Sequence, residues 1–162
     1  MKVSSDYFLL DNISLDKNIN LFFIDGQEET LAQKILEIII STLKKEGANE
    51  IIKILNTDID SNSVGRYSDS LFGGSKILIF ENPKKIDFEA LSECKQLKIS
   101  IIIKSSLSKS NFKLRKFCED SKSAYLVSCY KLGPELKKKI FLKHLSDNKI
   151  KIDQIGVGFF LE

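Results

Sequence analysis

Five short apolar runs that alternate with helix-like segments most limit the folds open to this chain. They are rich in β-branched and aromatic residues, apolar almost throughout, and cover residues 21–24, 51–55, 77–80, 99–103 and 125–127. A strand that is apolar on both sides needs cover on both faces, as in a parallel sheet between two layers of helices. We therefore predict an open, doubly wound α/β domain of five mainly parallel strands.

The segments between these runs have the spacing of helices. After the first run, Leu31, Ile35, Ile39 and Leu43 recur at three- and four-residue intervals, which predicts an amphipathic helix. Two more helices are expected over about 87–97 and 111–120, and a short one within the polar segment 56–70.

A break at Gly133-Pro134 separates the α/β part from the remainder. Proline suits the first turn of a helix, and Leu136, Ile140 and Leu145 give that helix an apolar stripe. We predict an α/β domain over residues 1–131 and the beginning of a small helical domain over 132–162.

Composition excludes several classes of function. A net charge of +3, from 25 basic and 22 acidic residues, does not predict a nucleic-acid-binding domain. Three cysteines without a CxxC pair and a single histidine argue against a zinc site and a disulfide framework. No signal peptide and no apolar run of membrane-spanning length is present. We expect a soluble, cytoplasmic protein without metal or other cofactor.

The first strand–turn–helix is where a phosphate-binding loop would lie. Such a loop needs GxxxxGK[ST], so that backbone amides wrap the phosphates and a lysine neutralises them. Gly26 has no second glycine after it, Glu28 and Glu29 would repel phosphate, and Lys34 is out of register by two positions. The loop is degenerate, and we expect neither ATP binding nor hydrolysis.

Other catalytic arrangements are weaker. Glu81 ends an apolar strand like a Walker-B carboxylate, but without a phosphate loop a solvated strand end is the better interpretation. His144 has no nucleophile near it in sequence and is expected at the surface. Cys118 and Cys129 are expected as small core residues. No enzymatic site is predicted.

The helix after the fourth run carries Lys113, Arg115 and Lys116 between its apolar positions. A solvated basic face is the preferred interpretation, with weak DNA contact as the alternative.

Leu71 and Phe72 stand before Gly73-Gly74, in polar surroundings. Because paired glycines end regular structure, these two side chains either project toward a partner or fill the domain's own core. Burying both would contribute about 3–6 kcal/mol. The residues alone do not decide between the two.

The order of these pieces resembles the delta subunits of the bacterial DNA polymerase III clamp loader. Similar segments are the opening strand and turn at 21–28, the SLFGG and strand at 70–80, the strand at 101–104, the lysine-rich loop and helix at 108–116, and the last strand and following helix at 124–152. The resemblance covers about residues 20–155.

This resemblance implies an AAA+-like fold that hydrolyses nothing itself and opens the ring-shaped sliding clamp during DNA replication. Leu71 and Phe72, with Ser70, match the family's clamp-contacting position. The implied partners are the sliding clamp and the other clamp-loader subunits, with DNA contact indirect or weak and no membrane.

Two departures from the family pattern limit what carries over. The C-terminal collar domain that joins the loader pentamer is missing from this sequence, and Asp69 stands where some members have an apolar residue. The alternatives are another inactive AAA+-like interaction module, a genuine nucleotide-binding domain, and a receiver-like or flavodoxin-like domain.

Overall fold

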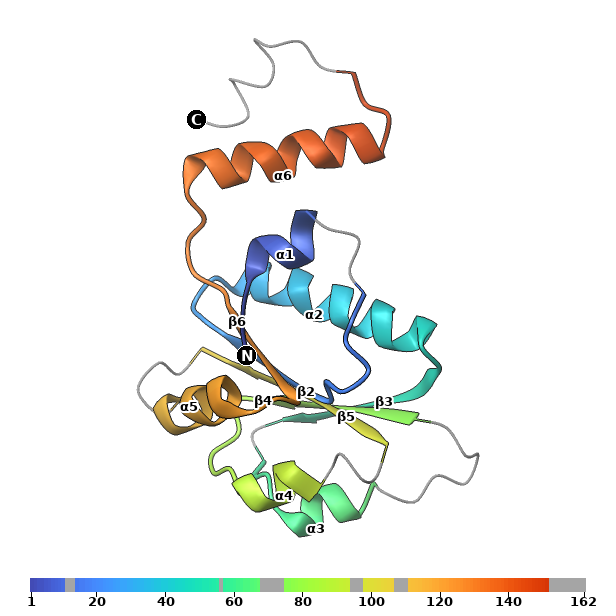
Figure 1. Ribbon diagram of the computed structural model, residues 1–162, viewed down its shortest axis with the longest axis vertical. Helices are drawn as coiled ribbons and strands as arrows, with labels where there is room; N and C mark the ends of the chain where they lie inside the picture. The colour runs from blue at the N-terminus through green and yellow to red at the C-terminus, as the bar shows by residue number, and fades with distance from the viewer. Residues whose placement is uncertain (11–13, 56, 68–74, 94–97, 107–110, 152–162) are drawn as a thin grey trace.

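The computed structural model describes residues 1–10, 14–55, 57–67, 75–93, 98–106 and 111–151. Its centre is a six-stranded sheet in which every paired strand is parallel, in the order β1-β6-β2-β5-β4-β3 (Figure 1). The strands are β1 Lys2–Ser4, β2 Leu21–Asp25, β3 Ala48–Leu55, β4 Ser75–Glu81, β5 Ile99–Ser105 and β6 Ala124–Ser128.

The predicted strands are all present, and β1 is an addition that the sequence did not indicate. β1 has three residues, of which only Val3 is buried, so it carries no apolar run. It exists because it pairs with β6, where Val3 lies opposite Val127. β5 also runs beyond its apolar run, so Lys104 and Ser105 belong to the sheet.

The strand order separates this fold from the flavodoxin-like alternative. In that fold the first strand lies between the second and third. Here the first of the five main strands, β2, lies between the last two, β5 and β6. A flavodoxin-like or receiver-like order is therefore wrong for this chain.

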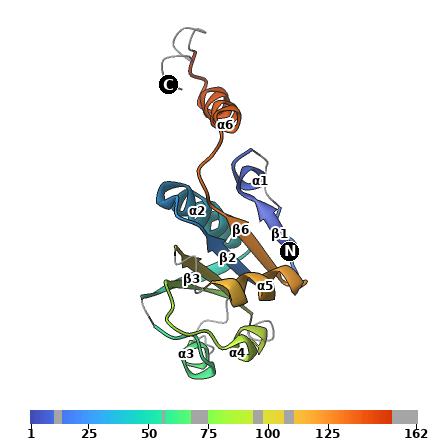
Figure 2. The ribbon, with the colours of Figure 1, turned by 90° about the vertical axis from the view of Figure 1, so that its left-hand side faces the viewer.

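Helices cover both faces of the sheet (Figures 1 and 2). One face carries α1 and α2, and α6 lies beyond α1; the other face carries α3, α4 and α5. Their bounds are α1 Ser5–Leu10, α2 Glu29–Lys45, α3 Ser61–Gly65, α4 Phe88–Glu93, α5 Phe112–Asp120 and α6 Pro134–Asp147.

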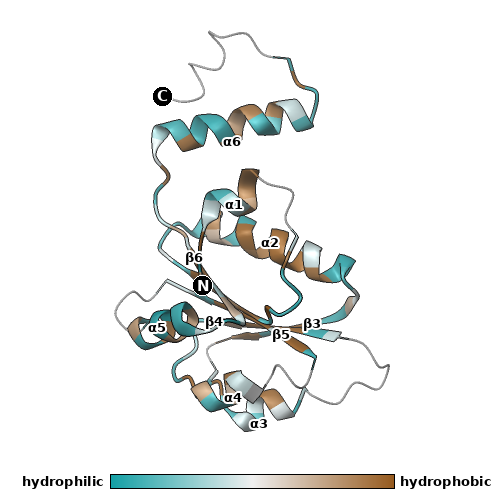
Figure 3. Cartoon of the chain, in the orientation of Figure 1, coloured by the Kyte–Doolittle hydropathy of each residue, from teal (hydrophilic) through white to brown (hydrophobic). Residues whose placement is uncertain are grey.

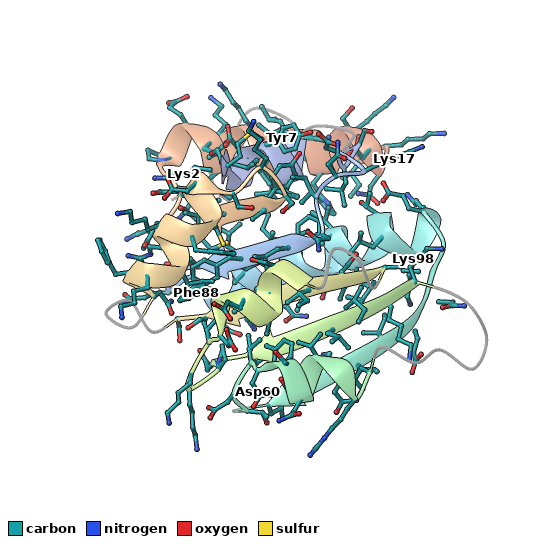
Figure 4. All side chains as sticks on the ribbon, turned by 60° about the horizontal axis from the view of Figure 1, so that its bottom comes forward. Lys2, Tyr7, Lys17, Asp60, Phe88 and Lys98 are labelled. Atoms are coloured by element: carbon teal, nitrogen blue, oxygen red, sulfur yellow. The ribbon has the colours of Figure 1, made fainter. Side chains whose placement is uncertain are left out.

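Alternation along the strands builds two cores. On β2, Phe22 and Ile24 join the cluster under α2, whereas Leu21 and Phe23 join the cluster under α4 and α5. On the second face the rings of Phe88 (labelled in Figure 4) and Phe117 pack 5.0 Å apart, which links α4 to α5. The sheet is thus apolar on both sides, as the continuous runs predicted.

α6 differs from the helices on the sheet. Hydrophilic residues take up much of its surface (Figure 3), and among its residues only Leu145 is buried. It is held through α1, where the Lys143 ammonium donates to the carbonyl of Leu10. Within the described residues no helix has the length and apolar character needed to cross a membrane.

Candidate functional site at the carboxyl edge of the sheet

A buried carboxylate lies where β2 ends. Asp25 is 2% exposed, and Arg115 binds it through two nitrogens, Nε to Oδ2 at 2.6 Å and Nη2 to Oδ1 at 3.0 Å. The Asn111 amide donates to Oδ1 at 3.1 Å, and the Tyr130 hydroxyl donates to Oδ2 at 3.3 Å. The Ser105 hydroxyl in turn donates to the Asn111 carbonyl oxygen at 3.2 Å. We call these five residues the Asp25 cluster.

The topology brings these residues together. Asp25 and Ser105 end the adjacent parallel strands β2 and β5, and they are register partners. Asn111 and Arg115 are four residues apart at the start of α5, and Tyr130 follows β6, the neighbour of β2 on its other side. The cluster therefore joins two strand ends, one helix and the segment that leads from β6 to α6.

Arg115 corrects one sequence-based prediction. We expected it on a solvated basic face with Lys113 and Lys116, and those two lysines are exposed. Arg115, however, points to a carboxylate 90 positions away in the chain. Helical periodicity cannot reveal this, because residue spacing carries no information about a distant acceptor.

The electrostatics of the cluster favour the charged pair. The hydrogen bond to Asp25 raises the pKa of Arg115 above its ordinary value, and burial of the guanidinium opposes this only in part. Bidentate arginine–carboxylate pairs are among the stronger polar contacts in proteins. No buried side-chain nitrogen or oxygen in the described ranges lacks a hydrogen-bond partner. The Asp25 cluster is thus a satisfied polar network in a low-dielectric setting.

The loop after Asp25 is closed by the protein's own carbonyl groups. The Gly26 amide donates to the Ser105 carbonyl at 3.3 Å, and the Glu28 amide donates to the Cys129 carbonyl at 3.2 Å. These are amides that a phosphate loop would turn toward its ligand. Gly26 itself has φ +152°, and a Cβ there would lie 1.9 Å from the Cys129 carbonyl oxygen. The turn is packed against the end of β6.

The space beside this turn does not suit a nucleotide. The cavity bounded by Gly26, Glu29, Glu81 and Lys104 measures about 60 Å³, against roughly 300–1,000 Å³ for typical ligand pockets. The Lys104 ammonium is paired with the Glu29 carboxylate. Lys34, the out-of-register lysine, is exposed on α2 and does not line this cavity.

The other predicted residues fall as follows. Cys118 and Cys129 are buried as expected, and desolvation raises the pKa of each thiol to about 12, which leaves both unreactive at neutral pH. His144 is exposed on α6, where its ring contacts the Asn148 amide. Cys94 lies outside the described residues. Among the residues that are described, no group of three or more histidine, cysteine, aspartate or glutamate side chains is placed to hold a metal ion.

The predicted clamp-contacting residues Ser70, Leu71 and Phe72 also lie outside the described residues, within 68–74. The first described residue after them is Ser75, at the amino end of β4. The Asp25 cluster lies at the carboxyl ends of the strands. In a parallel sheet the amino ends of the strands form one edge and the carboxyl ends form the opposite edge.

Sequence reasoning missed the Asp25 cluster. The available signal was a carboxylate placed directly after a fully apolar run, in Ile24-Asp25-Gly26. A charge at the end of a buried strand needs a partner. Nothing in the residue pattern singles out Arg115 as that partner among the 25 basic residues.

Comparison with known proteins gives a likeness of fold. No family model matches the chain, and no curated protein matches it by sequence. Among solved structures, the Bacillus subtilis DNA clamp loader delta protein (YqeN) superposes with a TM-score of 0.53 at 16% sequence identity. The match covers 80% of this chain and 43% of that protein. The predicted fold class, an AAA+-like open parallel sheet, is confirmed.

Proposed function

We propose that this chain acts as a delta-type subunit of a bacterial DNA clamp loader, the one that binds and opens the sliding clamp without hydrolysing ATP itself. The observation that carries the proposal is the fold: an AAA+-like sheet, similar to a clamp loader delta protein, whose phosphate-loop amides bond to the chain's own carbonyl groups. A protein with this arrangement keeps the nucleotide-binding scaffold and puts it to a different use, which is to present a surface to a partner.

Two further parts of the proposal rest on the sequence. Leu71 and Phe72, next to Ser70, are the proposed contacts with the sliding clamp. α6 is the proposed first helix of a lid domain that begins near residue 132. Other clamp-loader subunits are the remaining proposed partners, and the proposed place of action is the bacterial cytoplasm. The chain spans less than half the length of the clamp loader delta protein that it resembles, so assembly into a complete loader is a proposal as well.

The deciding experiment is a titration of the chain with the sliding clamp of the same organism. Replacing Leu71 and Phe72 together by alanine should weaken clamp binding about 100-fold or more, since interface anchors of this kind each contribute about 2–4 kcal/mol. The melting temperature should stay nearly unchanged. Leu55→Ala is the matched control, because this apolar side chain is 61% exposed and ends β3.

The opposite pairing of results contradicts the proposal. If Leu71 and Phe72 fill the domain's own core, their removal should cost about 2–5 kcal/mol each in stability and the melting temperature should fall. If the native chain does not bind the clamp but captures another protein, it is a different AAA+-like interaction module.

The nucleotide-binding alternative has its own test. Calorimetry with ATP and Mg²⁺ should give no heat of binding at micromolar concentrations, because a phosphate group would have to displace the Ser105 and Cys129 carbonyls from the loop amides. Micromolar affinity that disappears in Lys34→Ala would overturn this part of the proposal.

A further inference from the structure

Two exposed aromatic rings stand beside the Asp25 cluster at the carboxyl edge of the sheet. The Phe112 side chain is 70% exposed and Tyr130 is 49% exposed. Phe112 opens α5 after β5, and Tyr130 follows β6. Ligands of open α/β sheets bind outside the carboxyl ends of the strands, so both rings occupy the edge where such folds meet their ligands.

Arg115 connects the two rings. It lies three residues after Phe112, so the two side chains are neighbours on the helix surface. Its Nη2 donates to the Tyr130 hydroxyl at 3.1 Å. The same hydroxyl is anchored to Asp25 at 3.3 Å, which fixes the polar end of Tyr130 while its ring stays partly in solvent. Tyr130 is therefore a ring held in place before any ligand arrives.

Packing in the core does not explain why an aromatic residue stands at position 112. The buried stripe of α5 is made of Leu114 and Cys118, with Phe117 packed beside them. Phe112 faces away from that stripe. Single exposed apolar side chains are common. Phe112, however, has Arg115 as its neighbour on the helix, and Arg115 bonds the Tyr130 hydroxyl. The two exposed rings therefore share one guanidinium as a neighbour and offer faces on which planar groups can stack.

The charge around the rings is positive. Lys113 and Lys116 flank Phe112 and Arg115 on α5, and Lys131 follows Tyr130; all three lysines are exposed. The carboxylates of α5, Glu119 and Asp120, lie in its last turn. Glu28, whose amide bonds the Cys129 carbonyl, is the exposed acidic residue of the turn after β2. The surface therefore suits a short anionic ligand with planar groups.

We propose that Phe112, Tyr130 and the lysines at positions 113, 116 and 131 form a binding surface for single-stranded nucleic acid. Bases stack on the two rings, and the lysines contact the phosphates, which is the chemistry of sequence-tolerant single-strand binding. A duplex keeps its bases stacked inside the double helix, so they are not available to stack on the two rings. The proposal goes beyond clamp binding and does not depend on it, because none of its residues is among the proposed clamp contacts Ser70, Leu71 and Phe72.

The test measures fluorescence anisotropy of a labelled 20-nucleotide oligo(dT), with oligo(U) and a 20-base-pair duplex in parallel, using the full chain. The native chain should bind both single strands with Kd of about 1–100 µM at low salt and the duplex more weakly. Phe112→Ala should weaken binding about tenfold, in line with the contribution of one stacked base.

The lysines are tested through salt dependence. Replacing Lys113, Lys116 and Lys131 together by glutamine should lower the slope of log K against log salt by about 2, since each single-strand phosphate contact contributes about 0.7. Lys44→Gln with Lys45→Gln is the matched control, because these exposed lysines end α2 far along the chain from the surface. This control should leave the slope within about 0.5 of native.

Several outcomes overturn the proposal. One is the absence of oligo(dT) and oligo(U) binding at 100 µM; another is unchanged affinity in a Phe112→Ala variant that melts like the native chain. Equal binding of the duplex would show that the surface attracts nucleic acid only through nonspecific charge interactions. Effective competition by poly-glutamate would indicate an acidic protein partner instead. If oligonucleotides bind but the clamp does not, this surface stands and the clamp-binding proposal fails.

Discussion

The two edges of the sheet each hold an ion pair, and the pairs are built differently. At the carboxyl edge the Asp25 side chain is 2% exposed and Arg115 is 27% exposed, and Asn111 and Tyr130 add further hydrogen bonds. At the amino edge Lys76 is 7% exposed, while its partner Glu50, at 3.2 Å, is 49% exposed. The first pair joins separate elements; the second joins the neighbouring strands β3 and β4.

This difference shows where the fold keeps its polar organisation. The carboxyl edge is the place where many α/β proteins bind a ligand, and here it is filled by the chain's own side chains and carbonyl groups. The amino edge needs no such filling. A closed ligand site should therefore be costly to disturb, whereas the half-solvated pair should contribute little.

The largest effect is expected for Gly26→Ala. The new methyl would lie 1.9 Å from the Cys129 carbonyl oxygen on a backbone at φ +152°, so the turn and the end of β6 must separate. Strain and overpacking together predict a loss of about 4 kcal/mol in the free energy of unfolding, measured by urea denaturation. Gly65→Ala is the control, since nothing lies within 4 Å of a Cβ at Gly65. A loss below about 1 kcal/mol would mean that the turn is not tightly closed.

Arg115→Ala should come next. Removing the guanidinium leaves the Asp25 carboxylate buried with two remaining donors, Asn111 and Tyr130. We expect a loss of about 3 kcal/mol, at the low end for a broken buried pair because Arg115 is partly exposed. Lys116→Ala, an exposed position on the same helix, should change stability by less than about 0.5 kcal/mol. Equal effects of the two substitutions would show that the Asp25 cluster contributes no more to stability than an exposed side chain does.

The smallest effect is expected at the amino edge. Glu50→Gln removes the charge of a half-exposed partner, and Lys76 near the sheet end can adjust toward water. The loss should be under about 1 kcal/mol and should shrink further in 0.5 M NaCl, because exposed pairs are weakened by salt. If Glu50→Gln costs as much as Arg115→Ala, the contrast between the two edges is wrong.

Much of the fold was predictable because it depends on local patterns. The runs at 77–80 and 99–103 are apolar on both faces, and their burial in a sheet covered on both sides follows directly. Leu31, Ile35 and Ile39 on α2 were placed by helical spacing and are buried as expected. The strand β1 was not predictable, because Val3 offers one apolar residue and its stability comes from pairing with β6.

For the functional residues, too, local patterns could be predicted and distant contacts could not. The degenerate phosphate loop at Gly26 could be recognised from the sequence, because it lacks the second glycine and a lysine in the correct register. The exposed position of Lys34 on α2 agrees with this. The predicted clamp contacts, Leu71 and Phe72, remain a prediction from sequence. The paired state of Arg115 was not visible, and neither was its contact with Tyr130, since Arg115 on α5 and Tyr130 after β6 come together only in the folded chain.

The sequence by itself determined the five main strands and the helices between them, and that the phosphate loop lacks its usual residues, because these properties depend on neighbours within a few positions. The tertiary structure alone decided that Asp25 binds Arg115, that the Gly26 and Glu28 amides bond to carbonyls of β5 and of the residue after β6, and that Arg115 links α5 to Tyr130. Those contacts join residues up to about a hundred positions apart. Strand order brings them together, because it places the end of β2 between the ends of β5 and β6.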